Sequence, residues 1–589
     1  MSASSKKKLR KEQQSANLTA RQQAEQKEAK KLKIYTATFW IALALCVCIV
    51  LGVVLKAPVM GVAAKFTTSA IVGEHKVNAV ELNYFYIDAI NEYCNQYSSW
   101  LSYLLDTSKP LDEQVVDKET GETWADNFID MAMSNAKNTY ALYDAAIAAG
   151  HQFSDEEKAS MNELYKSMDT ISKQNGYSSA TAYLKAVYGN GASEKSYKEY
   201  YEVTCLASSY YNAYVEKLEE SFTDEDLRKF EKDKFDNYSS FTYAYHYMTV
   251  DSFLTGGTKG EDGKITYSDA EKKAAEEALK KAAEELAVPE NNTVSKLNDA
   301  IQKLEHSLKD DKKEENKAES KAAEDNKTED NKTEEKDEHK NCKHAVCTEK
   351  DEELYTSINS VMQEWLANKD RKLGDITALP YTTTSGEGED KVETLKGYYV
   401  VIFQERDDNK FGLVDVRHVL VPFEGGTTDK NGNKTYSDAE KKAAKEKAEK
   451  LYKEWKDGKA TEDTFAEMAK KHSTDGGSKE NGGLYEDVYP GQMVANFNDF
   501  CFDKDRKAGD HAVIDTEYGY HIMYYVGDSE TLYRDYMISN DLLEDEVTKW
   551  QEALNEAMKL EEKNTNFVDT DMVLGSGSAS SGSHDGHNH

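Results

Sequence analysis

The sequence predicts an α+β multidomain protein with one N-terminal transmembrane helix, a mainly α module and two tandem copies of one α+β unit. Three observations lead to this fold class. The chain has 589 residues, whereas a single hydrophobic core stops growing at about 250–300 residues. It contains one long uncharged apolar run, at 34–55, and a segment that begins at Gly256 recurs at Gly425.

The charge balance narrows the possible partners. The chain carries 74 Lys and Arg against 108 Asp and Glu, a net charge of −34. This excess of acid disfavours nonspecific attraction to nucleic acid or anionic lipid. We therefore expect no nucleic-acid partner.

Residues 34–55 (IYTATFWIALALCVCIVLGVVL) predict a membrane-spanning helix. At about 1.5 Å per residue, a helix of this length crosses a hydrocarbon layer of about 30 Å. The preceding tail, 1–33, holds ten Lys and Arg against three Glu, so it stays in the cytoplasm and the bulk of the chain is extracytoplasmic. The alternative is a signal peptide cleaved near Ala64, but signal h-regions are shorter, at about 7–15 residues, which favours a retained single-pass anchor in the cell membrane.

Residues 66–240 have helical periodicity. Asn78 followed by Glu81, and Ser154 followed by Glu157, are signatures of helix N-termini. Tyr-rich stretches such as the one around Tyr197 could form a peptide-binding surface, but aromatic residues at helical spacing are more often core. Another long helix is expected near the C-terminus, at 531–563.

The internal repeat defines two similar units, 241–406 and 412–530. The segment GGTKGEDGKITYSDAEKKAA of the first copy resembles GGTTDKNGNKTYSDAEKKAA of the second. Further along, the motif KDRK occurs in both copies, and KGYY of the first copy resembles YGYH of the second. Each copy begins with an alternating strand, passes through a Lys/Ala/Glu-rich helix and ends with a β-rich apolar run. Two copies of one domain are therefore expected in tandem.

The first copy contains an acidic insertion at about 309–352. It has no aromatic residue and is dominated by charge, so it cannot bury enough apolar area to offset its ordering entropy, and we predict disorder. Within it, Cys342 and Cys347 lie beside two histidines and could form a small disulfide loop, a metal site or two solvated thiols; the spacing matches no closed zinc pattern. The C-terminal segment 564–589 is expected to be a flexible Gly/Ser/His tail.

The second copy carries an ordered series of motifs: Arg417–His418–Val419–Leu420, Phe465–Ala466–Glu467, His472–Ser473–Thr474–Asp475, Gly482–Gly483–Leu484, Gly491–Gln492–Met493 with Phe497, and Tyr518–Gly519–Tyr520–His521. This series resembles a parvulin-type peptidyl-prolyl isomerase domain. The wider layout resembles extracytoplasmic foldases of the PrsA and SurA type, in which a helical chaperone module is made of segments before and after the isomerase unit. The resemblance implies two parvulin-like domains, the first degenerate, and a chaperone-like module at 66–240 completed by 531–563.

The resemblance also implies site residues. His418 and His521 match the paired buried histidines, Asp475 lies where the family carries Cys or Asp, and Leu484, Met493 and Phe497 match the pocket for the proline ring. Each histidine could also be an ordinary core histidine on a strand. The loop Gly482–Gly483–Leu484–Tyr485–Glu486 departs from the family's Gly-Gly-Asp-Leu-Gly, which leaves open the preference for the residue before proline.

Isomerisation of an X–Pro bond breaks no σ bond, so it needs no nucleophile, metal or cofactor. We expect a membrane-anchored prolyl isomerase and chaperone that acts on unfolded or newly secreted polypeptides with X–Pro bonds, at a cell surface of the Gram-positive type. The alternative is a non-catalytic holdase that keeps the parvulin fold as a peptide-binding platform. The first copy retains His246 but has Tyr399 in place of the final histidine, so we expect it to be non-catalytic.

Overall fold

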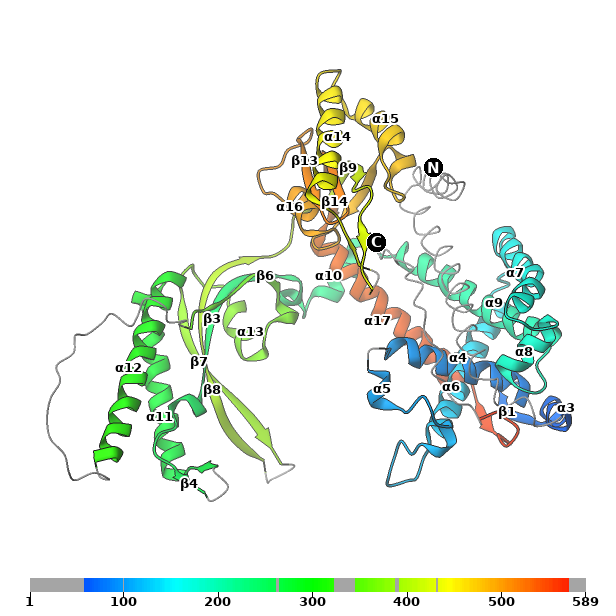
Figure 1. Cartoon of the computed structure of the whole chain (residues 1–589), viewed down its shortest axis with the longest axis horizontal. Helices are drawn as coiled ribbons and strands as arrows, with labels where there is room; N and C mark the ends of the chain where they lie inside the picture. The colour runs from blue at the N-terminus through cyan, green and yellow to red at the C-terminus, as the bar shows by residue number, and fades with distance from the viewer. Residues whose placement is uncertain are drawn as a thin grey trace. The chain divides into compact units, whose positions relative to one another are not determined.

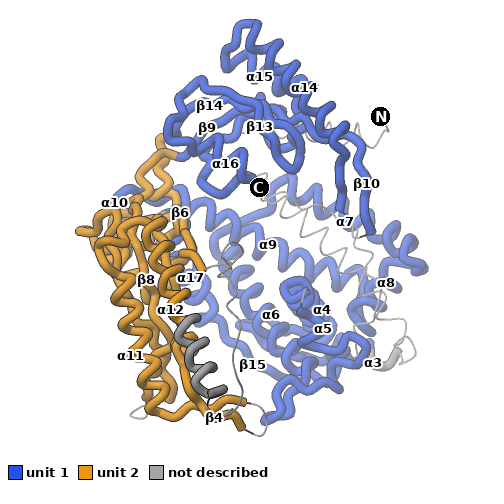
Figure 2. The backbone as a smooth tube through the Cα atoms, turned by 60° about the vertical axis from the view of Figure 1, so that its left-hand side comes forward, with its two compact units in different colours: residues 1–224, 413–529, 539–589 blue, residues 225–412, 530–538 orange. Residues whose placement is uncertain are grey.

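The computed structural model describes residues 58–98, 100–260, 264–321, 345–386, 391–430 and 433–570. The chain divides into two compact units (Figures 1 and 2): the first comprises 1–224, 413–529 and 539–589, and the second 225–412 and 530–538. The expected basic tail, transmembrane helix 34–55 and the end of the C-terminal tail lie outside the described residues. Among the helices that are described, none combines the length and apolar character needed to cross a membrane.

The N-terminal part of the first unit is mainly helical. Its helices are α3 (Pro58–Phe66), α4 (Ala79–Gln96), α5 (Leu101–Leu104), α6 (Trp124–Ala148), α7 (Asp155–Gln174), α8 (Ala180–Tyr188) and α9 (Glu194–Glu219). The predicted starts are confirmed: Asn78 accepts from the amides of Val80 and Glu81, and Ser154 forms a capping box with Glu157. These caps satisfy amides that the first helical turn leaves without partners.

Tyrosines form much of this helical core. Tyr197 and Tyr200 are buried, and the ring of Tyr84 packs against both. The interpretation of these positions as core is therefore confirmed. Further along α9, Tyr214 stacks on Trp550 of α17 (Tyr533–Ala557), with ring centroids 3.7 Å apart.

The C-terminal helix is shorter than predicted. It ends at Ala557, and β15 (Leu560–Glu562) then pairs with β1 (Thr68–Val72), which also pairs with β2 (His75–Asn78). Because strand pairing satisfies the backbone of 560–562, the helix does not continue to 563. Residues from the two ends of the described chain thus share one small sheet.

The second unit contains a four-stranded antiparallel sheet, here called the first sheet, in the order β6-β3-β8-β7. The strands are β3 (Ser240–Thr249), β6 (Thr348–Leu354), β7 (Ile376–Ser385) and β8 (Val392–Asp407). Alternate residues point to opposite faces. One face packs against α11 (Asp269–Leu286) and α12 (Val294–Lys321), and the other against α13 (Ser360–Ala367).

The ends of the predicted acidic insertion differ from the expectation. Helix α12 continues to Lys321, and β6 begins at Thr348 and pairs with β3. The Lys/Glu-rich composition of 309–321 suits a helix as well as a disordered chain, and partner strand β3 supplies the backbone bonds of β6. Residues 322–344 lie outside the described part.

Cys347 is not a solvated thiol. It is buried among apolar side chains of the second unit, and its amide donates to the Asn298 side chain. Burial raises the pKa of the Cys347 thiol to about 11, so the thiol stays protonated near neutral pH. Cys342 and the neighbouring His339 and His344 lie outside the described residues.

The second sheet belongs to the first unit and has the order β12-β9-β14-β13. Its strands are β9 (Gly412–Pro422), β12 (Leu484–Val488), β13 (His511–Thr516) and β14 (Gly519–Leu532). One face packs against α14 (Asp438–Lys456) and α15 (Glu462–His472), and the other against α16 (Ala495–Cys501).

The two sheets have the same strand order relative to the chain, as the sequence repeat indicates. In both copies, the first strand of the sheet is followed by a small hairpin whose two strands have two residues each. The hairpin is β4–β5 (Thr258–Lys259, Ile265–Thr266) in the first copy and β10–β11 (Thr427–Thr428, Lys434–Thr435) in the second. Each following helix begins with a capping box, at Ser268 or Ser437. In the KDRK motifs, Arg371 lies 4.0 Å from the Trp365 ring and Arg506 lies 4.0 Å from the Phe500 ring.

His246 is not on the face that the repeat suggested. Its neighbours two residues away, Ala244 and Met248, pack with α11 and α12, so His246 faces those helices by the alternation of the strand. On the opposite face, Tyr247 is the register partner of Tyr399, and their rings stack with centroids 4.5 Å apart.

Candidate functional site

Two central strands of the second sheet bring the predicted histidines together. On β9, Val414 and Val416 face α16, and on β14 Met523 and Tyr525 do so. Because side chains alternate along a strand, His418 and His521 share that face. The alternating apolar residues therefore position both imidazoles on one side of the sheet.

The two histidines form a buried, hydrogen-bonded pair. Their Nδ1 atoms are 2.9 Å apart, and the rings lie 5.1 Å apart at an interplanar angle of 14°. Only 2% of His418 and 5% of His521 is exposed. The outer nitrogen of each ring also has a partner, Ser478 Oγ for His418 and Thr516 Oγ1 for His521.

Asp475 lies at one end of this network. After α15 ends at His472, the chain turns so that Asp475 Oδ2 accepts from the amide of Ser478 at 2.8 Å and from its hydroxyl at 2.6 Å. The Tyr485 hydroxyl donates to the same oxygen at 3.1 Å, and His418 Nε2 is 3.3 Å away. The side chain of Asp475 is 13% exposed.

The surroundings of Asp475 and of His521 set the protonation state of each group. Burial acts to raise the pKa of Asp475, but the nearby His418 ring and the bonds from Ser478 outweigh it and hold that pKa well below its usual range. Burial, together with the neighbouring His418 ring, lowers the pKa of His521 to about 3. Asp475 is therefore a carboxylate and His521 a neutral imidazole near pH 7.

The two hydroxyl groups at the ends of the histidine pair set the direction of the outer hydrogen bonds. The Ser478 hydroxyl donates to Asp475, so its oxygen accepts from His418 Nε2–H. The Thr516 hydroxyl donates to the Gly519 carbonyl, so its oxygen accepts from His521 Nε2–H, and the bond between the two Nδ1 atoms joins the two ends of the network. This assignment follows from the donors and acceptors that each group possesses.

Phe497 covers the histidine pair. Its ring centroid lies 5.3 Å from that of His418 and 5.6 Å from that of His521, both edge to face. Phe497 is buried on α16, and Met493, just before that helix, packs into the same apolar cluster. The structure thus brings together five of the six predicted site residues.

Leu484 is the exception. It is the register partner of Arg417, whereas Tyr485 is the partner of Val416. Opposed residues of an antiparallel pair share a face, so Leu484 points away from the histidines, and its placement beside the proline pocket is wrong. Tyr485 occupies that face instead, with its ring 5.3 Å from His418.

Gly483 holds the altered loop against β9. Its carbonyl accepts from the His418 amide at 2.8 Å, and its φ is +76°. A Cβ at this position would lie 2.2 Å from the His418 carbonyl oxygen, so only glycine fits without movement of the backbone.

Sequence reasoning missed Ser478, Tyr485 and Thr516. Each carries a local signal: Ser478 follows Asp475 by three residues, as in a side-chain-to-backbone turn; Tyr485 alternates with Leu484 on a strand; and Thr516 pairs with Gly519 at the end of the hairpin that carries His521. Within the described part of the chain, no group of three or more His, Cys, Asp or Glu side chains is arranged to hold a metal ion.

Residues 398–527 match the family model described as the PPIC-type PPIASE domain. "Foldase protein PrsA" of Staphylococcus epidermidis is 35% identical over 159 residues, which is 26% of this chain and 45% of that protein. "Foldase protein PrsA 3" of Bacillus anthracis is 35% identical over 121 residues, 19% of this chain and 42% of that protein. The chain therefore spans less than half the length of these curated relatives.

Solved structures give a weaker likeness. A crystal structure of a peptidylprolyl isomerase (PrsA) from Bacillus anthracis is 21% identical and covers 26% of this chain and 59% of its own, with a TM-score of 0.16. A chain from a study of SurA-like chaperones of Campylobacter jejuni is 25% identical and covers 26% and 57%, with a TM-score of 0.15. Residues 398–527 of this chain are accordingly a PPIC-type parvulin domain, homologous to the corresponding part of the PrsA foldases.

Proposed function

We propose that the chain is a peptidyl-prolyl cis-trans isomerase and chaperone for unfolded or newly secreted polypeptides, with its catalytic site in the unit 412–530. The observation that carries this proposal is the buried His418–His521 pair, which is hydrogen-bonded, covered by Phe497 and linked to the Asp475 carboxylate. The match to the PPIC-type family and the name of the relatives, foldase, support the same activity.

The reaction sets simple demands on the site. The barrier to rotation about the peptide bond, about 18–20 kcal/mol, comes from amide resonance that is lost as the bond twists. A catalyst therefore has to bind the twisted amide more tightly than the planar forms. Rigid polar groups in a dry site meet this demand because they need no reorganisation during the reaction.

We assign different roles to the two sides of the site. Met493 and Phe497 hold the proline ring by apolar contact, while the histidine pair keeps the polar groups in place through its four hydrogen-bonding nitrogens. Asp475 acts on the amide. Within the described residues, the hydrogen bonds of this carboxylate are made by Oδ2, and we assign Oδ1 to face the substrate carbonyl. A negative charge there opposes the build-up of charge on the carbonyl oxygen that resonance requires, and so destabilises the planar amide.

We propose the first sheet as a non-catalytic copy. Tyr247 and Tyr399 are stacked register partners on the face covered by α13, where the second sheet has its histidine pair facing α16. The same proposal includes the rest of the domain organisation. It places the two parvulin-like domains at 241–406 and 412–530 and a chaperone-like module at 66–240 with 531–563. It also includes a single-pass anchor at 34–55 with the N-terminus in the cytoplasm. A holdase that binds chains without catalysis is the alternative.

The test is cis-trans exchange of a short Ala–Pro peptide, measured by NMR exchange spectroscopy with the full chain. Acceleration by the wild type should fall about tenfold or more in Met493→Ala and in His521→Gln, because each removes a group that contacts the reacting segment or positions Asp475. His472→Ala, a histidine outside the network, is the matched control and should keep the rate. Absence of acceleration by folded wild-type protein, checked by circular dichroism, would leave the holdase.

A further inference from the structure

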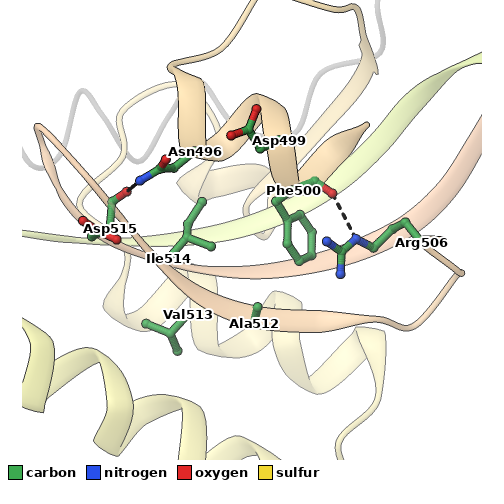
Figure 3. Close-up of a pocket in the computed structure, with 8 residues that line it drawn as sticks. All are labelled: Asn496, Asp499, Phe500, Arg506, Ala512, Val513, Ile514 and Asp515. Atoms are coloured by element: carbon green, nitrogen blue, oxygen red, sulfur yellow. Dashed lines mark hydrogen bonds between the residues drawn. The ribbon is translucent and has the colours of Figure 1, made fainter. Parts of the chain in front are cut away.

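A pocket of about 360 Å³ lies along β13, the edge strand of the second sheet, apart from the histidine pair (Figure 3). None of the six predicted site residues is among those that line it. Its lining residues come from α16, from the loop that follows, and from β13: Asn496, Asp499, Phe500, Arg506 and the run Ala512–Asp515. Because four consecutive strand residues border the pocket, it is open to the main chain of β13 as well as to both of its faces.

The outer edge of β13 presents main-chain groups that β14 does not use. The amide of Tyr525 donates to the Asp510 carbonyl, so these two opposed residues are a hydrogen-bonded pair at the end of the β13–β14 ladder. Hydrogen-bonded and non-bonded pairs alternate along an antiparallel ladder, so Val513 and Asp515 belong to non-bonded pairs, and their N–H and C=O groups point away from β14. In agreement, the Asp515 carbonyl accepts from the Asn496 side chain at 2.8 Å, outside the ladder. No partner is found for either group of Val513 within the described residues.

The side chains around this edge combine an apolar wall with negative charge. Ala512, Val513 and Ile514 are only half-buried, as expected beside an unfilled position. Asp499 and Asp515 are exposed, and neither makes an ion pair in the part of the chain that the structure describes. The positive charge of Arg506 is already engaged: it donates to Asp503 and to the Phe500 carbonyl, and it lies over the Phe500 ring.

We propose that the outer edge of β13 binds an extended polypeptide segment as an added strand, with main-chain bonds to Val513 and a Lys or Arg side chain of the segment in the pocket. The alkyl stem of such a side chain would pack on Phe500 and Ile514, and its charge would lie near Asp499 and Asp515. This inference goes beyond the proposed isomerase activity, because strand addition requires no X–Pro bond. Helix α16 borders both places, since it supplies Phe497 to the histidine pair and Phe500 to the pocket.

The probe is a fluorescein-labelled, proline-free peptide of about eight residues with alternating Thr and Val and one central Lys, titrated against the full chain by fluorescence anisotropy. Two relatives of the probe separate the contributions: one has Glu in place of Lys, and one is N-methylated at alternate residues, which removes main-chain donors but keeps the side chains. We expect the Lys peptide to bind, the Glu peptide to bind more weakly, and the N-methylated peptide not to bind.

Two double variants complete the test. Asp499→Asn/Asp515→Asn should weaken binding of the Lys peptide about fivefold or more, in the range of two exposed ion pairs. The matched control, Asp463→Asn/Glu467→Gln, removes the same charge from exposed positions on α15 and should bind as the wild type does. In hydrogen exchange, the peptide should protect the segment 511–516.

Binding that is insensitive to N-methylation or to the two aspartates, protection elsewhere in the chain, or no binding at about millimolar peptide would each overturn the proposal. Isomerase activity is measured on the same samples. A chain that binds the probe but does not accelerate exchange refutes the proposed function only, and the converse result refutes only the edge site.

Discussion

Acidification should weaken the second sheet through His521. Burial and the adjacent His418 ring lower the pKa of His521 to about 3, whereas an unfolded histidine titrates near 6.5. Below about pH 6.5 the unfolded chain therefore takes up a proton that the folded domain does not, and stability falls with pH until the folded pKa is reached. At about pH 5, which is about 1.5 units below the pKa of an unfolded histidine, this proton uptake lowers the free energy of unfolding by about 2 kcal/mol relative to neutral pH. The population of the opened state is then about 30-fold larger than at neutral pH.

Hydrogen exchange of the β14 amides, followed by mass spectrometry, measures this opening directly. A single unfolding midpoint would not serve, because the chain has more than one compact unit and need not unfold in one step. After correction for the intrinsic exchange rate, protection of β14 should fall between about pH 7 and 5 in the wild type and markedly less in His521→Gln, which cannot take up the proton. Equal pH dependence in both proteins, or a ring titration of His521 near 6.5 by NMR, would refute the reasoning.

Three further predictions follow from the fold. His246→Ala should leave isomerase activity at the wild-type level in the NMR exchange assay, because His246 faces α11 and α12; a loss of rate in folded protein would contradict this placement. Gly483→Ala should destabilise the second sheet by about 3 kcal/mol or more, because its Cβ would lie 2.2 Å from a backbone oxygen of β9, whereas Gly491→Ala, at φ +82° with nothing within 4 Å, should cost only about 1 kcal/mol; equal losses of β9 protection in hydrogen exchange would show that the close contact is unimportant. Arg534→Met should destabilise the second unit by about 3–5 kcal/mol, because Arg534 is 0% exposed and its loss leaves the buried Glu231 carboxylate with only the half-exposed Arg228 as an ion-pair partner among the described residues; the added change Glu231→Gln should restore part of the stability, and no recovery in the double variant would argue against the weakly compensated carboxylate as the cause.

The sequence predicts element types well where local signals are strong. The caps at Asn78 and Ser154 are found where expected, because capping depends on the first turn alone. It predicts boundaries poorly where a distant partner decides them. The helix ends at Ala557 because residues 560–562 pair with β1, which lies nearly five hundred residues earlier in the chain. No pattern in the sequence near Ala557 indicates this pairing.

The site shows the same division between local and distant information. His418, Asp475, His521, Met493 and Phe497 could be identified because their motifs are ordered along the chain. The face on which a residue lies is a different matter, since a one-residue shift moves a side chain to the other side of the sheet. Leu484 and His246 were each expected on the face of the sheet opposite to the one on which they lie. In each case the next residue along the strand, Tyr485 or Tyr247, occupies the expected face.

The two sheets of this chain act as an internal comparison of what the site requires. Imidazole has two nitrogens on opposite sides of its ring, so it can pass a chain of hydrogen bonds onward, as the pair does between Thr516 and Ser478. A phenol has its one polar atom at the tip of its ring, so it makes hydrogen bonds only at that end and cannot carry them from one side of the ring to the other. The stacked Tyr247 and Tyr399 therefore keep the shape of a ring pair but interrupt the connection that positions a carboxylate such as Asp475. Replacement of the two histidines removes a whole network rather than one catalytic group, which explains how one fold can appear twice in a chain and support the proposed chemistry in only one copy.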